Sequence, residues 1–192
     1  KLGFEEKKLS RTPAFRIAKK GKESGVEFAG LPPGHELTSL ILALLQVSGR
    51  PPKVDEEVIN RIKAIDTPLH FETYVSLSCH NCPDVVQAFN IMAVINPNIS
   101  HTMIEGGMFQ DEVKAKGIMS VPTVFHNNEI LTSGRTNIEQ LLDLIAGPVS
   151  ETTFADKGIF DVLVIGGGPA GNSAAIYAAR KGIKTGLLAE TF

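Results

Sequence analysis

The chain holds only two cysteines, and they stand three residues apart in the segment Cys79-His80-Asn81-Cys82. A run rich in β-formers, residues 71–77, comes directly before them, and apolar residues at helical spacing follow. So few cysteines exclude a secreted scaffold stapled by several disulfides and indicate redox or metal chemistry. The pair therefore predicts a fold in which a strand leads into a Cys-x-x-Cys motif at the start of a helix.

The block around this motif, residues 68–146, is predicted to follow the order β-α-β-α-β-β-α. Its last two strands flank a turn at Asn127-Asn128, and its last helix begins at a capping box, Thr136-x-x-Glu139. The strands and helices are expected, in chain order, at residues 71–77, 79–96, 99–104, 109–116, 121–125, 130–132 and 138–145.

The preceding block, residues 1–67, is predicted to hold a hairpin, broken by Gly21 and Gly25, and two helices. Residues 147–158 are polar and show no period, so we interpret them as a linker. The last block, residues 159–192, is expected to be a strand, a glycine-rich turn, a helix and a strand.

Cys79 is predicted to face the N-terminus of the helix, where unpaired backbone N–H groups and the helix dipole favour a thiolate. The thiolate is the attacking species in thiol–disulfide exchange. Cys82 lies in the first helical turn and is expected to be less exposed, and Pro83 fits that turn because its missing N–H is not needed there. We interpret Cys79 as the nucleophile and Cys82 as the resolving thiol.

Other interpretations of this motif stay open. The cysteines are alternatively two structural residues that stand close, or half of a zinc site, although the five histidines show no paired metal-ligand spacing. His80 either lowers the pKa of Cys79 as a cation or is an exposed spacer. The other four histidines are given no role; they are His35, His70, His101 and His126.

Pro122 is the second residue that indicates a redox site, because it stands at the entry to a strand, forty residues after Cys82. Proline is unusual in that position unless it has a special role. It is either a cis-proline that packs against the dithiol or an ordinary trans-proline at a sheet edge.

The third signal is the glycine-rich run Gly166-Gly167-Gly168-Pro169-Ala170-Gly171, which follows a buried-strand pattern and precedes a helix expected at 172–181. In a dinucleotide site, Gly166 allows the tight turn, Gly168 the approach of a pyrophosphate, and Gly171 close packing of the helix. Glu190 ends the next strand at the offset of a ribose-binding acid. The alternative is a purely structural glycine turn.

The element order, the Cys-x-x-Cys motif and the segment 119–123 resemble a thioredoxin or glutaredoxin fold. Thioredoxins carry a buried acid six residues before the first cysteine, and Thr73 stands there in this chain. Glu36, at the start of a helix in the first block, is our candidate replacement if the two blocks pack together. The alternative is a solvated first-turn glutamate that is stabilised only by the helix dipole.

The combination of both motifs resembles the flavoprotein subunit of bacterial alkyl hydroperoxide reductase over nearly the whole chain, and the glycine run is more similar to the FAD-binding start of thioredoxin reductases than to an NAD site. The resemblance implies an α/β chain of tandem thioredoxin-like folds followed by a partial Rossmann-type FAD-binding βαβ unit. The first fold, residues 1–67, lacks a Cys-x-x-Cys and is truncated at its start. The most similar segments are 28–30, 34–36, 38–40, 76–88 and 180–187.

That resemblance implies a relay in which NADH reduces FAD, a reductase dithiol follows, and the Cys79–Cys82 pair then reduces a partner peroxiredoxin. The C-terminal reductase domain with the NADH site is expected beyond residue 192, since the chain starts without Met and stops inside a motif. The resemblance also implies a homodimer for the whole protein. Two competing hypotheses are a tandem-thioredoxin protein disulfide oxidoreductase or isomerase, and a docking module in which the motif is incidental.

Composition argues against other classes of partner. The formal net charge is −2, with no basic block, which offers nucleic acid or an anionic membrane no footprint. The longest nearly uncharged apolar run, 37–47, is too short to span a bilayer. Together with the dithiol, these features predict a cytoplasmic protein without a membrane or nucleic-acid partner.

Overall fold

The computed structural model describes residues 3–148 and 158–189. The chain divides into two compact units, Lys1–Pro148 and Val149–Phe192, which are described separately below. The predicted linker lies largely outside the described residues, and so does Glu190.

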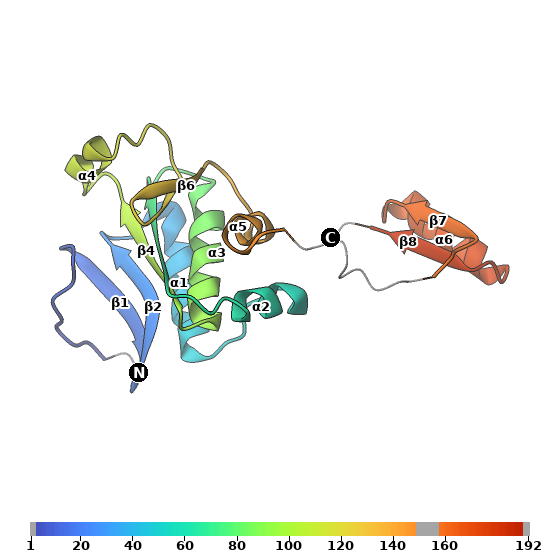
Figure 1. The fold of residues 1–192 in the computed structure, drawn as a ribbon, viewed down its shortest axis with the longest axis horizontal. Helices are drawn as coiled ribbons and strands as arrows, with labels where there is room; N and C mark the ends of the chain where they lie inside the picture. The colour runs from blue at the N-terminus through green and yellow to red at the C-terminus, as the bar shows by residue number, and fades with distance from the viewer. Residues whose placement is uncertain (1–2, 149–157, 190–192) are drawn as a thin grey trace. The chain divides into compact units, whose positions relative to one another are not determined.

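The first unit is built on one six-stranded sheet in the order β1-β2-β4-β3-β5-β6 (Figure 1). β2 and β3 pair in parallel with β4, which lies between them, whereas the β1–β2, β3–β5 and β5–β6 pairs are antiparallel. The strands are β1 (Ala14–Lys19), β2 (Lys22–Ala29), β3 (Leu69–Val75), β4 (Ile99–Glu105), β5 (Thr123–His126) and β6 (Glu129–Ser133).

The helices cover the two faces of this sheet unequally. One face carries the larger core, which is filled from α1, α2, α3 and α5, and the other carries a smaller cluster next to α4. Aromatic packing ties the larger core together, since the rings of Phe71 and Phe89 lie 4.7 Å apart. The helices are the 3₁₀ turn η1 (Gly34–Glu36), α1 (Leu37–Ser48), α2 (Glu56–Lys63), α3 (Cys82–Ile95), α4 (Gln110–Ala115) and α5 (Ile138–Ala146).

The predicted boundary at 67/68 does not separate two sheets. β2 of the first block pairs with β4 of the second from Val26 opposite His101 to Ala29 opposite Ile104. A Cβ on Gly25 would overlap the Ile99 carbonyl oxygen, so the strands approach closely only because this residue is glycine. The hairpin of the first block thus extends the sheet of the second, and both halves share one core.

Most predicted elements are confirmed, and the turns obey the expected backbone rules. The hairpin turn has positive φ at Asn127 (51°) and Asn128 (65°), as a type I′ turn requires. Gly49 closes α1 with a φ of 118°, a left-handed value that favours glycine.

Two predicted helix starts and one predicted capping box are wrong by one to three residues. The helix expected from Cys79 begins at Cys82, because residues 76–81 form the loop that presents the first cysteine. The capping box is formed by Asn137 and Gln140, not by Thr136 and Glu139; Asn is an effective N-cap, and the Thr136 hydroxyl donates to Gly134 instead. The helix expected from 172 begins at Pro169, since proline suits the first helical position.

The second unit is a small βαβ arrangement. Its two strands, β7 (Val162–Ile165) and β8 (Thr185–Leu188), are parallel, and α6 (Pro169–Arg180) connects them. Apolar side chains of these strands stay exposed, including Ile165 at 77% and Leu188 at 60%. Across both units, no described helix combines the length and the apolar character that crossing a membrane requires.

Candidate functional site

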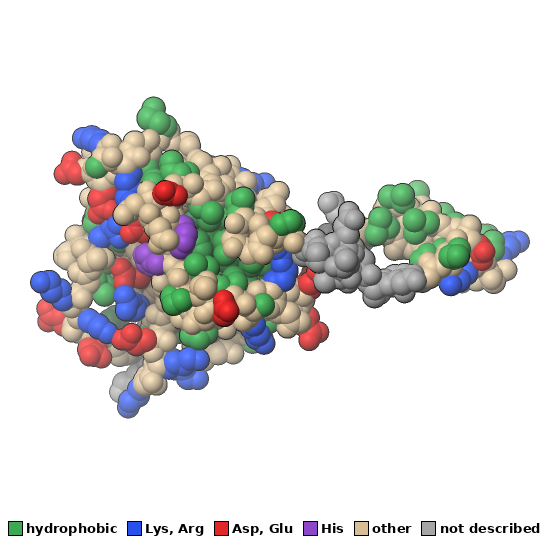
Figure 2. Space-filling model, viewed as in Figure 1, with side chains coloured by type: hydrophobic (Ala, Val, Ile, Leu, Met, Phe, Trp, Pro, Cys, Tyr) green, Lys and Arg blue, Asp and Glu red, His purple; other side chains and the backbone are tan. Residues whose placement is uncertain are grey.

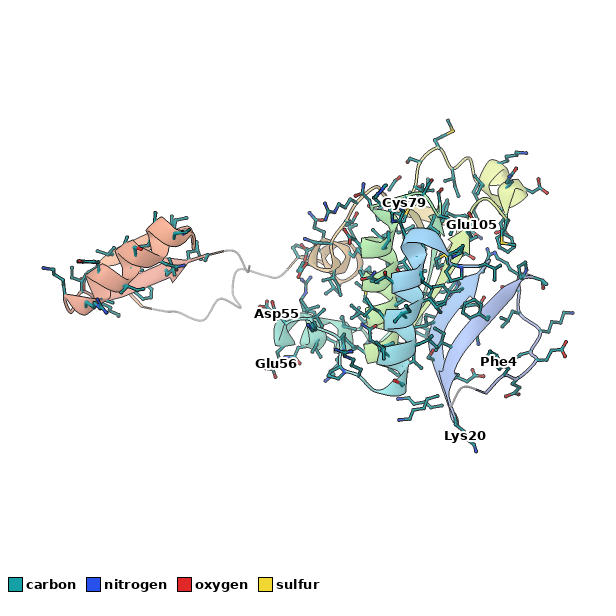
Figure 3. All side chains as sticks on the ribbon, turned by 180° about the vertical axis from the view of Figure 1, so that it is seen from behind. Phe4, Lys20, Asp55, Glu56, Cys79 and Glu105 are labelled. Carbon is teal, nitrogen blue, oxygen red and sulfur yellow. A yellow bond between two sulfur atoms is a disulfide. The ribbon has the colours of Figure 1, made fainter. Side chains whose placement is uncertain are left out.

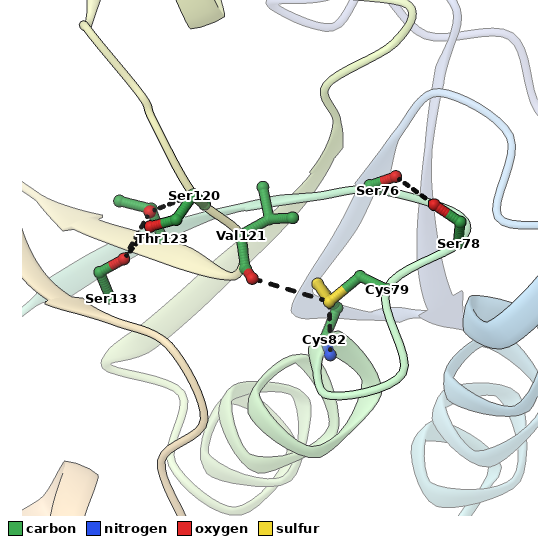
Figure 4. The surroundings of a disulfide bond; sticks show 8 residues. All are labelled: Ser76, Ser78, Cys79, Cys82, Ser120, Val121, Thr123 and Ser133. Carbon is green, nitrogen blue, oxygen red and sulfur yellow. Dashed lines mark hydrogen bonds between the residues drawn. A yellow bond between two sulfur atoms is a disulfide. The ribbon is translucent and has the colours of Figure 1, made fainter.

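Cys79 and Cys82 form a disulfide at the carboxyl end of β3, with their Cα atoms 5.5 Å apart (Figure 4). Cys82 is fully buried in the first turn of α3, whereas Cys79 is half-buried in the preceding loop. The backbone N–H of Cys82 donates to the Cys79 sulfur at 3.1 Å. Cys79 is therefore the sulfur that a partner can approach, and a helix N-terminal donor points at it.

Pro122 lies beside the disulfide and follows a cis peptide bond. The carbonyl oxygen of Val121 is 3.8 Å from the Cys79 sulfur, so the strand entry and the cysteine loop face each other. Hydroxyl hydrogen bonds hold this entry in place: Ser133 contacts Ser120 at 2.9 Å and Thr123 at 3.0 Å (Figure 4). The expectation that Pro122 packs near the dithiol in the cis form agrees with this geometry.

The 3₁₀ turn η1 brings the first block to the cysteine loop. Gly34 has a φ of 64°, and a Cβ there would come 2.9 Å from the Leu77 carbonyl oxygen. The backbone N–H of His35 donates to the same oxygen at 3.5 Å, and its ring lies 4.1 Å from the ring of His80, between centroids. The two blocks therefore meet at the redox motif, as the Glu36 hypothesis requires.

Glu36 is fully buried, and neither of its carboxylate oxygens has a hydrogen-bond partner among the described residues. Burial raises the pKa of this carboxyl to about 7, and the nearby Ser39 hydroxyl opposes the rise. The alternative of a solvated first-turn glutamate is therefore wrong. A carboxyl with a pKa near neutrality is suited to exchange a proton at physiological pH.

Thr73, at the position where thioredoxins carry an acid, is fully buried in a polar cluster that the sequence did not indicate. Its hydroxyl bonds His101 Nε2 at 2.8 Å, and His101 Nδ1 bonds Asn90 Oδ1 at 2.8 Å. Burial lowers the pKa of His101 to about 3, so the imidazole is neutral. Strand alternation was the available signal, because His101 shares a face of β4 with the buried Ile99 and Met103.

Charged side chains of the first unit lie both at the disulfide end of the sheet and away from it (Figure 2 and Figure 3). Figure 3 shows Cys79 and Glu105 at the same end of the first unit, where the parallel strands β3 and β4 end. The Glu105 carboxylate is already bonded by the N–H groups of Gly107 and Met108. Figure 2 shows acidic and basic side chains intermingled around the β1–β2 hairpin. Within residues 3–148 and 158–189, no group of three or more histidine, cysteine, aspartate or glutamate residues is arranged to hold a metal ion.

The glycine-rich turn of the second unit connects β7 to α6 through a close approach of its backbone. Gly166 has a φ of 110°, and a Cβ on Gly171 would overlap the Gly166 carbonyl oxygen. Gly168, just before α6, has open space around it, and the Asn172 side chain closes the loop by donating to Gly167 at 2.7 Å. The glycine run thus leads directly into α6, with Gly168 at the N-cap position.

Comparison with known proteins agrees with this two-part organisation. Residues 69–146 match the thioredoxin domain family, and residues 161–191 match the FAD-dependent oxidoreductase family. The chain is 58% identical over its whole length to a Bacillus subtilis protein named NADH dehydrogenase, and 50% identical over 99% of its length to the alkyl hydroperoxide reductase component AhpF of Staphylococcus aureus. It spans only 38% and 37% of those relatives, respectively.

Two solved structures share the fold of a large part of this chain. A domain of alkylhydroperoxide reductase AhpF from Enterococcus faecalis superposes with a TM-score of 0.67 and 32% identity, covering 70% of this chain and 65% of that one. A protein disulfide oxidoreductase from Aeropyrum pernix, at 24% identity and a TM-score of 0.63, covers 70% of this chain and 59% of that one and shows the fold alone. The overall arrangement of strands and helices around the disulfide in this chain thus has counterparts in solved structures.

Proposed function

We propose that this chain belongs to the flavoprotein subunits of alkyl hydroperoxide reductase, to which it is similar, and that its Cys79–Cys82 pair passes electrons to the disulfide of a peroxiredoxin. The observation that carries the proposal is a disulfide whose outer sulfur is half-buried, faces the Val121 carbonyl oxygen and receives a helix N-terminal N–H. This is the arrangement that a reversible dithiol exchange needs.

The exchange proceeds in two steps. The Cys79 thiolate attacks one sulfur of the partner disulfide, which breaks the partner S–S bond and forms a mixed disulfide. The Cys82 thiol then loses its proton and attacks Cys79, which releases the second partner sulfur as a thiolate and restores the Cys79–Cys82 disulfide. Two electrons move to the partner, the partner thiolates take up protons, and this chain is oxidised.

Glu36 is the proposed acceptor of the Cys82 proton. It belongs to η1, which packs against the cysteine loop through Gly34 and His35. Its pKa of about 7 lets it hold or release a proton at neutral pH, which the buried and neutral Thr73–His101 pair does not do. In this proposal Glu36 takes the role of the buried acid of thioredoxins, because Thr73 stands at the position where thioredoxins carry that acid.

The second unit is the proposed start of an FAD site. Gly166, Gly168 and Gly171 would shape the loop that holds the pyrophosphate at α6, with Glu190 on the ribose. When bound, FAD supplies the electrons that it receives from NADH. We further propose that the NADH site lies in a C-terminal reductase domain of the same polypeptide, which works as a homodimer in a reducing cytoplasm. Residues 1–67 and 68–146 are the two proposed thioredoxin-like halves.

The proposal is tested with chain reduced by dithiothreitol, freed of the reagent and mixed with oxidised cognate peroxiredoxin. Peroxiredoxin thiols are then counted by mass-tagging on gels. We expect the wild type to transfer two electrons per chain, Cys79→Ser to transfer none, and Cys82→Ser to accumulate the mixed disulfide. The chain has no other cysteine, so each variant keeps a single thiol.

Full transfer by Cys79→Ser would refute the assignment. The disulfide isomerase hypothesis makes a different prediction, namely that the reduced chain reshuffles scrambled folding substrates faster than it reduces peroxiredoxin. A reduction potential close to that of thioredoxin, about −270 mV, would count against isomerase activity.

A further inference from the structure

In the described part of the chain, the Glu36 carboxyl group is buried without a hydrogen-bond donor. Both of its oxygens are buried, and neither has a hydrogen-bond partner among the described residues. A neutral carboxyl tolerates that environment, whereas an ionised carboxylate in an apolar interior requires a donor. A proton acceptor must be ionised before it acts, so a donor has to be available to it.

Ser39 is placed to supply that donor. It lies three residues after Glu36, at the junction of η1 and α1, and it is fully buried. Its hydroxyl oxygen accepts a hydrogen bond from Gln87 Nε2 at 3.3 Å. The Ser39 hydrogen is not used in that bond, so it is free to turn toward a nearby acceptor.

Gln87 connects this pair to the surface. It lies on α3, five residues after Cys82, and is half-buried. It also lines a surface pocket of about 250 Å³, together with Asp84 and Arg135. The Gln87–Ser39 hydrogen bond therefore connects a hydroxyl three residues after the buried carboxyl with a surface pocket, along the helix that carries the resolving cysteine.

We infer that Ser39 is a positioning residue, which Gln87 holds so that its hydroxyl hydrogen turns to Glu36 when the carboxylate ionises. The inference rests on the proposed role of Glu36 as proton acceptor. Ser39 moves no proton itself. The proton passes from the Cys82 sulfur to a Glu36 oxygen, and the Ser39 hydrogen bond exists while Glu36 is charged. The opposing influence of Ser39 on the raised pKa of Glu36 has the sign that this role requires.

The test compares Ser39→Ala with Thr38→Ala, a matched control in which a neighbouring exposed hydroxyl is removed. The carboxyl of Glu36 is titrated by ¹³C NMR in the full chain, and the second exchange step is timed by the decay of the mixed disulfide. Because a hydrogen bond to a charged group is lost, we expect Ser39→Ala to raise the Glu36 pKa by about one pH unit and, since fewer carboxylates are then ionised, to slow the second step about fivefold at pH 7. Gln87→Met is expected to act in the same direction with a smaller effect.

The first exchange step, measured on the Cys82→Ser background, should be unchanged by Ser39→Ala. An unchanged Glu36 titration in both Ser39→Ala and Gln87→Met would overturn the inference, as would an equal shift in Thr38→Ala. The proposed role of Glu36 as proton acceptor fails separately, if Glu36→Gln leaves the second step at the wild-type rate, and the proposed function itself fails if Cys79→Ser retains full transfer. The NMR titration does not depend on that outcome, so the two failures are distinguishable.

Discussion

The imidazole rings of His35 and His80 lie 4.1 Å apart between centroids and are tilted by 45°, although the two residues are 45 positions apart in the chain. His80 stands between the two cysteines, and His35 belongs to the turn that carries Glu36. The contact therefore joins the redox motif to the half of the unit that has no cysteine. We therefore expect substitutions at these two positions to have non-additive effects on the free energy of unfolding.

A double-mutant cycle of His35→Ala and His80→Ala should reveal this coupling. Since aromatic pairs contribute beyond the area that they bury, we expect an interaction free energy of about 0.5–1 kcal/mol in the oxidised protein. Urea unfolding of the four proteins measures it. The cycle of His35→Ala with His126→Ala, whose ring packs on Phe71 instead, should be additive. Equal results in the two cycles would mean that the contact is not formed in solution.

Glu36 should make the protein less stable as the pH rises. The carboxyl of the unfolded chain loses its proton near its ordinary pKa of 4.5, whereas the folded protein keeps it up to about 7. The folded state thus binds more protons between these values, and stability falls through this window. Relative to wild type, Glu36→Gln should gain up to about 3 kcal/mol in unfolding free energy between pH 4.5 and 7.

Urea unfolding of Glu36→Gln and of the wild type at pH 4.5, 5.5, 6.5 and 7.5 measures this pH-dependent difference in stability. Glu57→Gln, a substitution of an exposed glutamate on α2, is the control and should follow the wild-type curve. If the difference between Glu36→Gln and wild type does not change with pH, the buried carboxyl has no raised pKa.

His101 should act in the opposite direction. Burial lowers its pKa from 6.5 to about 3. Between these pH values the imidazole is protonated in the unfolded chain and neutral in the folded protein. Stability is therefore lost as the pH falls below 6.5, by about 1.4 kcal/mol for each pH unit while this difference lasts. His101→Gln should flatten the slope of stability against pH between 6.5 and about 4, whatever its effect at neutral pH. NMR of the wild type should show an imidazole that stays neutral at pH 5; a ring that titrates near 6.5 would contradict the structure.

Arg11 should anchor the segment before β1. Its guanidinium donates to Glu112 at 3.0 Å and to Glu72 at 2.7 Å, and its side chain is only 13% exposed. Removing it leaves two partly desolvated carboxylates, so we expect Arg11→Met to lower the unfolding free energy by about 2 kcal/mol. Lys7→Ala breaks an exposed ion pair with Glu23 and should change the unfolding free energy by less than about 0.5 kcal/mol. Equal effects in urea unfolding would show that Arg11 is no more than a surface charge.

Local patterns predicted the elements well, and contacts between distant segments account for what they missed. Apolar spacing located α1 and α5, and the paired asparagines located the β5–β6 turn, since these signals are contained within a few residues. Whether Glu36 is buried depends on η1 packing against Leu77, and no local pattern contains that contact. The capping box was misplaced by one residue because Thr136 and Asn137 are both acceptable N-caps, and only the backbone conformation at Asn137 decides between them.

The pairing of β2 with β4 has a consequence for how the chain can be divided. A minimal thioredoxin cut out at residue 68 would keep both cysteines and the cis-proline. It would also expose a central strand and lose η1, and with it His35 and Glu36. The half that carries no cysteine thus supplies part of the surroundings of the redox motif, and the two halves are expected to work only as one piece.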